Sequence, residues 1–208
     1  MSSLEGPVTA VLRIFDVVVG VALERALKDD GMIRFALRQF RYVRGYRFRR
    51  GTKPLHVAYE VIYWSSFLVL VSLALRFAIG SEVQMKHVYG EATLESTLGF
   101  MGDLLFLVLF GVVLVRAALS ARLTDFLRWL IMFLLLGIIW SCIELARWPG
   151  SPYGCWWLGL NSLQLAFTLP CRWMIRRRPR DARYALMALA AVYMTLFAVD
   201  VWHLVEMS

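Results

Sequence analysis

Long apolar runs alternate with short polar segments along most of this chain. About 20 mostly apolar residues cross the hydrocarbon core of a bilayer as a helix. Four runs meet that requirement: residues 57–79, 98–115, 126–146 and 153–171. A fifth run, residues 184–205, contains an acid near its end, but the uncharged stretch before this acid covers most of the hydrocarbon thickness. The pattern therefore predicts five transmembrane helices in this part of the chain.

The first apolar stretch, residues 7–27, is a weaker candidate because four charged residues interrupt it. Arg13 and Asp16 are three positions apart and can pair on one helical face, which lowers the cost of inserting them into lipid. Two arrangements stay open: six spans, or five spans and an N-terminal interfacial helix. No basic region precedes the apolar stretch, so we expect no cleavable signal peptide.

Composition supports a membrane protein. Hydrophobic residues make up 60% of the 208 residues, whereas soluble domains are typically about 45–50% apolar. The mean hydropathy is +0.62. We therefore expect residues 1–208 to form one all-α domain, a polytopic transmembrane helical bundle without a soluble domain.

The basic residues predict the orientation of this bundle. Residues 28–53, 116–128 and 172–183 hold nine, three and six of the 23 Lys and Arg residues. Short loops rich in Lys and Arg stay in the cytoplasm. The loops at 80–97 and 147–154 carry few basic residues, so we expect them outside, together with the C-terminus. The expected location is the inner (plasma) membrane.

Residues 31–50 are the most basic part of the expected cytoplasmic face. Ile33, Leu37, Phe40 and Val43 recur at helical spacing, with arginines at neighbouring positions. This pattern predicts a basic amphipathic helix that lies on the anionic inner leaflet.

The same arginines allow other roles. Their recurrence at every third position resembles the fourth helix of voltage sensors, although the run is too polar to span a membrane. They can also bind a nucleotide, a nucleic acid or an acidic partner at the cytoplasmic face. The candidates for binding an anion or partner are Arg38, Arg41, Arg44, Arg47, Arg49, Arg50, Arg176, Arg177 and Arg178.

Acids and amides within the expected spans are the main candidates for function, because such groups are costly in lipid. Turned toward one another, they would form a polar cavity that favours cations. The candidates for an ion path are Asp103, Asn161, Gln164, Asp200 and Glu60.

Each of these groups also has a structural interpretation. The amides in residues 153–171 can join neighbouring helices or subunits. Asp103 can pair with Arg76, the nearest cation along the sequence, and Asp200 can sit in headgroup water. Glu144 can pair with Arg147 at the membrane surface.

Metal and redox chemistry have weaker support. Asp200, His203 and Glu206 are spaced by threes on one helix and can offer at most three metal ligands. The three cysteines have no metal-type spacing. We expect buried free thiols, with a disulfide between Cys142 and Cys155 as the alternative.

Catalytic motifs are absent from the sequence: it has no glycine-rich phosphate loop, no catalytic triad pattern and no HExxH. We therefore expect neither an enzyme nor a cofactor. The leading hypothesis is a homo-oligomeric ion channel, pore or transporter subunit. The alternatives are a membrane-anchored sensor or effector of the stress or antiviral type, whose basic face binds a partner, and an accessory subunit of a larger complex.

The orientation can be tested by labelling single cysteines in intact cells. Residues 80–97 and 149–154 should react with an impermeant reagent added outside, because their loops carry few basic residues. Residues 116–128 and 176–183 should react only after the membrane is opened. Labelling of Arg178→Cys from outside would contradict the expected orientation.

Overall fold

A computed structural model describes most of the chain from residue 53 onward. Before that point it describes only a few helical positions, so residues 31–50, with Arg38 to Arg50, and most of 7–27 lie outside the described residues. The side chains of Glu60 and Glu206 are also outside the described set. The described residues are 13, 17, 18, 20, 21, 24, 53–88, 94–120, 122–149, 152–178 and 181–207.

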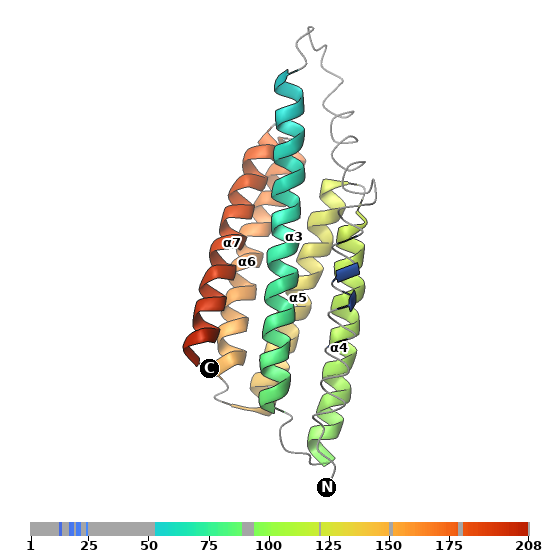
Figure 1. The fold of residues 1–208 in the computed structure, drawn as a ribbon, viewed down its shortest axis with the longest axis vertical. Helices are drawn as coiled ribbons and strands as arrows, with labels where there is room; N and C mark the ends of the chain where they lie inside the picture. The colour runs from blue at the N-terminus through green and yellow to red at the C-terminus, as the bar shows by residue number, and fades with distance from the viewer. Residues whose placement is uncertain are drawn as a thin grey trace.

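The described chain is helical, and no strand occurs in these ranges, which confirms the all-α class. Consecutive helices run in opposite directions and are joined by short connections (Figure 1). Each of the five long apolar runs falls within one helix. The helices are α3 (Lys53–Val88), α4 (Leu94–Ala118), α5 (Leu123–Arg147), α6 (Pro152–Arg177) and α7 (Ala182–Met207).

Local sequence explains where the helices begin and end. Pro152 opens α6, a position where the missing N–H of proline costs no hydrogen bond. Asp125 in the first turn of α5 and Arg147 in its last turn complement the helix dipole. The backbone N–H of Trp148 donates to the carbonyl of Glu144 at 2.8 Å and closes the last turn of α5.

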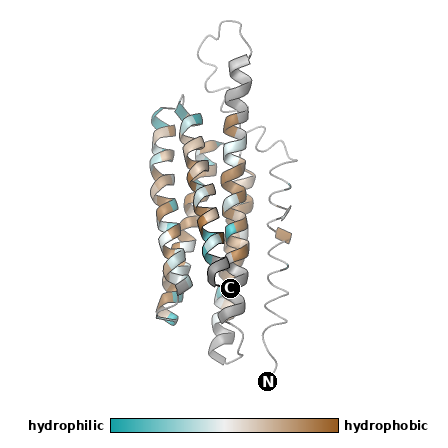
Figure 2. Ribbon diagram, turned by 60° about the vertical axis from the view of Figure 1, so that its left-hand side comes forward, coloured by the Kyte–Doolittle hydropathy of each residue, from teal (hydrophilic) through white to brown (hydrophobic). Residues whose placement is uncertain are grey.

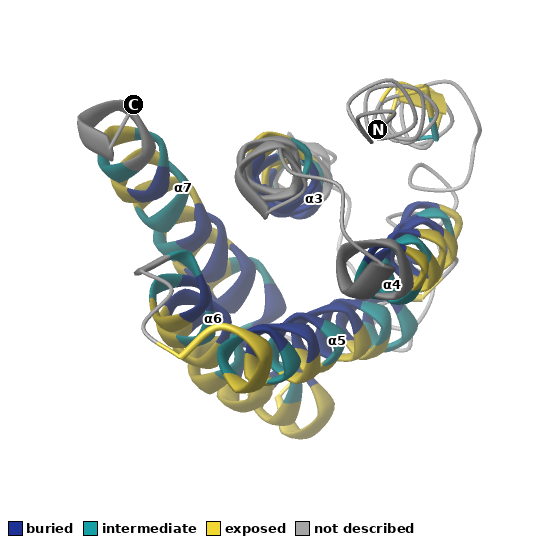
Figure 3. Cartoon of the chain, turned by 90° about the horizontal axis from the view of Figure 1, so that it is seen from below, coloured by how far each residue is buried: buried dark blue, intermediate teal, exposed yellow. Residues whose placement is uncertain are grey.

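Four of the described helices form an arc, and the fifth, α3, packs into its open side (Figure 3). Seen along the bundle, α4, α5, α6 and α7 follow one another around the arc, and α3 lies in its opening (Figure 3). The buried faces of the four arc helices point inward, and their exposed faces point outward. The first described helix therefore packs against the last, α7, as well as against its neighbour in the sequence, α4.

Aromatic rings hold α3 against α4 and α5. The ring of Phe77 on α3 lies 4.1 Å from that of Phe110, 5.3 Å from Phe133 and 5.9 Å from Trp140, measured between centroids. Tilted and edge-on contacts of this kind stabilise a core beyond the area that they bury. This cluster forms the apolar floor of the site described below.

Among the described residues, three helical segments are long and apolar enough to cross a membrane: Gly99–Ala118, Leu123–Arg147 and Ala182–His203. In α3 the apolar part, Trp64–Ile79, is shorter. Hydrophilic positions gather at the connected ends of α6 and α7, while apolar positions cover much of the length of the helices (Figure 2).

Large apolar side chains also lie on the outside of the bundle. On α4, Met101, Leu105, Val108 and Val112 are each more than half exposed and follow one face of the helix. A continuous apolar stripe of this kind indicates contact with lipid or protein.

Replacing Phe110 by Ala should lower the stability of the bundle by up to about 3–5 kcal/mol, because it empties a buried position between three other rings. The exposed Leu105 on the same helix supplies the control, since Leu105→Ala opens no cavity. Thermal unfolding in detergent measures both. Equal effects of the two changes would contradict the packing of α4 described here.

Candidate functional site

Four of the five residues expected on an ion path lie inside the bundle. The exposed fraction is 4% for Asp103, 7% for Asn161, 1% for Gln164 and 1% for Asp200. The fifth, Glu60, has no described side chain. The acids and amides therefore face the interior of a single chain.

The centre of this polar interior is an ion pair between α3 and α7. Arg76 Nε donates to Asp200 Oδ2 at 2.9 Å, and the two side chains are 5% and 1% exposed. Trp156 on α6 donates from Nε1 to the other carboxylate oxygen, Oδ1, at 2.7 Å. Both oxygens of Asp200 are thus engaged, as a buried carboxylate requires.

A chain of hydrogen bonds extends from this pair along α6. Arg76 Nη1 donates to Oε1 of Gln164. The backbone carbonyl of Gln164 accepts a hydrogen bond from the Thr168 hydroxyl at 2.7 Å, and that hydroxyl also lies 2.8 Å from the hydroxyl of Tyr193 on α7. Arg76, Asp200 and these polar groups join α3, α6 and α7, and we call them the Arg76 centre.

Asp103 belongs to a separate cluster between α4 and α5. Its Oδ1 accepts hydrogen bonds from Trp140 Nε1 at 2.8 Å and from Arg147 Nη1 at 3.2 Å. Gly102 makes room for this contact, because a Cβ there would lie 3.1 Å from Arg147 Nη2. Asp103 therefore fastens α4 to the end of α5.

This arrangement corrects one expected pairing and one expected environment. Arg76 pairs with Asp200 rather than with Asp103. Asp200 is buried, not immersed in headgroup water. The physical reason is that α3 packs mainly along α7, so the nearest acid in space comes from the other end of the described chain. The sequence contains one indication of this pairing: Arg76 and Asp200 have opposite charges, and each lies within an otherwise apolar run.

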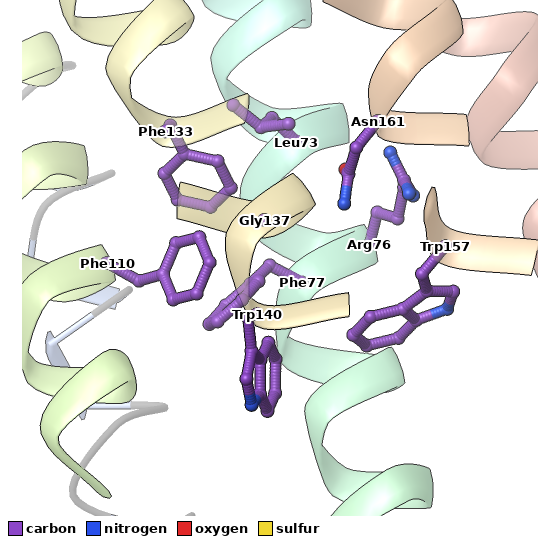
Figure 4. Close-up of a pocket in the computed structure, with 9 residues that line it drawn as sticks. All are labelled: Leu73, Arg76, Phe77, Phe110, Phe133, Gly137, Trp140, Trp157 and Asn161. Atoms are coloured by element: carbon purple, nitrogen blue, oxygen red, sulfur yellow. The ribbon is translucent and has the colours of Figure 1, made fainter. Parts of the chain in front are cut away.

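A small cavity of about 10 Å³ lies beside the Arg76 centre. A space of this size holds about one water molecule. Arg76 and Asn161 line one side, and the aromatic cluster lines the other (Figure 4). Gly137 on α5 permits the approach of Asn161, because a Cβ at 137 would lie 2.6 Å from the Asn161 amide nitrogen.

Among the described residues, buried hydrogen-bond donors near the Arg76 centre lack partners, and one of them, on Trp157, belongs to a side chain that lines this cavity. Within the described chain, the buried Nε1 of Trp157 and Nε2 of Gln164 have no hydrogen-bond partner. The Ser141 hydroxyl, on α5 one turn beyond Gly137, has none either. Such buried donors are costly unless an acceptor reaches them. The site can therefore hold a small group that accepts hydrogen bonds.

The expected metal stripe is not assembled among the described residues. Asp200 is engaged by Arg76 and Trp156. His203 packs its ring 4.2 Å from that of Trp156. The side chain of Glu206 is not described, and the described residues contain no group of three metal-binding side chains.

The three cysteines are free thiols. Cys171 is buried and lies 3.6 Å from the carbonyl oxygen of Ala185. Cys142 and Cys155 are exposed, which corrects the expectation of burial for these two. Arg176, Arg177 and Arg178 are also exposed and lie at the end of α6.

Double-mutant cycles should separate the two ion pairs. Arg76→Gln should cost about 3–5 kcal/mol, because it leaves the buried carboxylate of Asp200 without its counter-charge. Adding Asp200→Asn should recover part of this loss, whereas adding Asp103→Asn should give an additive loss. Chemical unfolding in detergent measures each variant. Coupling between positions 76 and 103 instead of 76 and 200 would refute the pairing.

Comparisons of the chain with protein-family models, with curated proteins and with solved structures find no match.

Proposed function

We propose that this chain is a multi-pass membrane protein in which α3 to α7 cross an inner membrane, with residues 7–27 as a sixth span or an interfacial helix. Three segments have the length and apolarity to do so, and large apolar side chains cover the outside of the bundle. The polar residues of α6 explain its lower hydropathy, because they face the Arg76 centre. The arginine-rich turns between α4 and α5 and between α6 and α7 lie in the cytoplasm, and the C-terminus lies outside.

Within this membrane the protein acts as a channel or transporter subunit for a small ion. The observation that carries this proposal is the buried pair of Arg76 and Asp200. Gln164, which contacts Arg76, is the thirteenth of 26 residues in α6, or about 18 Å from the start of the helix at 1.5 Å per residue. Trp156, which contacts Asp200, is the fifth residue of α6. The ion pair therefore lies in the half of the bundle nearer the start of α6 but within the apolar part of α7, where ionisable groups are costly and mark substrate paths.

The path runs through a single chain. In a pore between subunits, Asn161, Gln164 and Asp200 would lie on the surface of each chain, yet all three are buried within it. The cavity beside Arg76 is too small for a continuous path. Passage therefore requires α3 or α7 to move relative to α6. Assembly into a homo-oligomer stays in the proposal as an association of chains that each contain their own path.

The transported ion is an anion rather than the cation that the acids alone indicate. Arg76 and Arg147 neutralise Asp200 and Asp103. What stays unused is hydrogen-bond donors: Nε1 of Trp157, whose side chain lines the cavity, and Nε2 of Gln164, whose side chain contacts Arg76. Hydrogen-bond donors without a partner stabilise negative charge in a medium of low dielectric constant.

Ion flux through purified protein in liposomes tests this function. The unmodified chain should carry chloride in preference to potassium. The double variant that combines Arg76→Gln with Asp200→Asn should lose the flux, even though changing both partners keeps the bundle folded. Asp103→Asn is the control, because it removes a carboxylate outside the Arg76 centre and should leave the flux unchanged.

Two results would overturn the proposal. Absence of flux under every ion gradient would remove the transport function. Normal flux in the double variant of Arg76→Gln with Asp200→Asn would place the path elsewhere.

A second candidate, a membrane-anchored sensor or effector, is favoured by the exposed arginines at the end of α6, Arg176 to Arg178. Its basic face would receive a soluble cytoplasmic protein or a nucleotide. The discriminating result is a partner that co-purifies with the unmodified chain, is lost on changing these arginines to Gln, and is accompanied by no ion flux. An accessory subunit would instead be unstable when isolated.

A further inference from the structure

The connection between α6 and α7 carries a strong positive charge. Residues 172–183 contain six arginines and one acid, Asp181. Five of the arginines are described, and within the described chain none forms an ion pair with a carboxylate. Hydrophilic positions are concentrated at this end of the two helices in Figure 2. The charge is therefore available to an external anion.

Two of these arginines are each associated with an exposed aromatic ring. The Arg177 guanidinium carbon lies 4.5 Å from the centre of the Trp173 ring. The Arg183 guanidinium carbon lies 4.5 Å from the centre of the Tyr184 ring, and its Nη2 donates to the Tyr184 hydroxyl at 2.6 Å. Both rings are 58% exposed. Exposed Trp and Tyr at the end of an apolar helix are typical of the membrane–water boundary.

The two helices present these groups at the same height. Cys171 on α6 lies against the carbonyl of Ala185 on α7, which places Arg172 level with residues 183 and 184 on the antiparallel partner. Arg172 and Arg183 are both half-buried, and the Nε atom of each is buried without a hydrogen-bond partner among the described residues. Each helix thus contributes a half-buried arginine that has no carboxylate partner in the described chain, at the level of the aromatic rings.

We propose that this turn binds the phosphate of an anionic phospholipid headgroup, with Arg172 and Arg183 as the principal ligands. Arginine matches phosphate with paired donors. Arg176 to Arg178 add attraction of longer range toward a negatively charged surface. The proposal rests on the membrane embedding proposed above but is independent of ion transport.

The surroundings favour a lipid over a soluble anion. On the apolar side of the arginines, Trp173 and Tyr184 are exposed, and Met187 continues this surface one turn along α7 with 48% exposure. A phosphate attached to acyl chains places its charge on the arginines and its chains along these side chains. Inorganic phosphate, a nucleic acid or an acidic peptide has no group that would use them.

The turn between α4 and α5 offers a matched control. Arg116 and Arg122 are exposed arginines that flank it. Among the residues that the structure describes, no aromatic ring lies under either guanidinium. Changing both to Gln removes the same charge from the same end of the bundle without touching the proposed site.

The experiment measures thermal stability of the detergent-purified chain on adding phosphatidylglycerol, with phosphatidylcholine as the neutral comparison, and counts retained lipids by native mass spectrometry. Phosphatidylglycerol alone should stabilise the unmodified chain. Each of Arg172→Gln and Arg183→Gln should weaken its retention about five-fold, from roughly 1 kcal/mol per arginine at a membrane surface. The control variant, in which both Arg116→Gln and Arg122→Gln are made, should retain phosphatidylglycerol as the unmodified chain does.

Each contrary result overturns the proposal. Equal loss in the control variant shows attraction to general surface charge rather than a site. Equal stabilisation by inorganic phosphate or by a single-stranded oligonucleotide assigns the arginines to a soluble anion. If the double variant of Arg172→Gln with Arg183→Gln is as stable in detergent as the unmodified chain and retains as much phosphatidylglycerol, the turn binds no headgroup. Loss of ion flux with normal lipid retention would affect only the transport proposal.

Discussion

A buried charge must meet its counter-charge, and in this chain that requirement joins α3 to α7. Arg76 on α3 and Asp200 on α7 are nearly inaccessible, and their contact brings α3 into the opening of the arc formed by the other helices. Trp156 and Gln164 complete the environment of the pair from α6. Without the pair, each charge would stand alone in apolar surroundings at a cost larger than most single contacts in the bundle supply.

The distribution of polarity follows from this centre. Amides, hydroxyls and acids occupy the interior, and many large apolar side chains lie outside. Close helix contact makes the interior possible: Gly137 leaves space for the Asn161 amide, and Gly102 leaves space for the Arg147 guanidinium. The result is a bundle whose outer surface suits lipid and whose core keeps unused donors beside a cavity for one small acceptor.

The helices were predictable because their signal is local: each long apolar run lies inside one helix, and the arginines at 116, 122 and 176–178 cluster near the turns. Burial of Asp103 was predictable for the same reason, since apolar residues surround it in sequence. The partner of Arg76 was not, because sequence order favoured α4, whereas packing sets α3 against α7. Trp140 and Trp156 were also missed as hydrogen-bond donors to the two acids, since an indole in an apolar run gives no sign of its partner.

The separation of the central pair along the chain has a consequence for biogenesis. Arg76 and Asp200 are 124 residues apart, and a ribosome needs roughly ten seconds to add that much chain at typical rates. During that interval α3 has left the ribosome while its counter-charge has not been synthesised. Until α7 emerges, Arg76 must therefore stay out of the hydrocarbon core, either in the translocation machinery or at the bilayer surface. The synthesis of α7 is thus the step that allows α3 to settle.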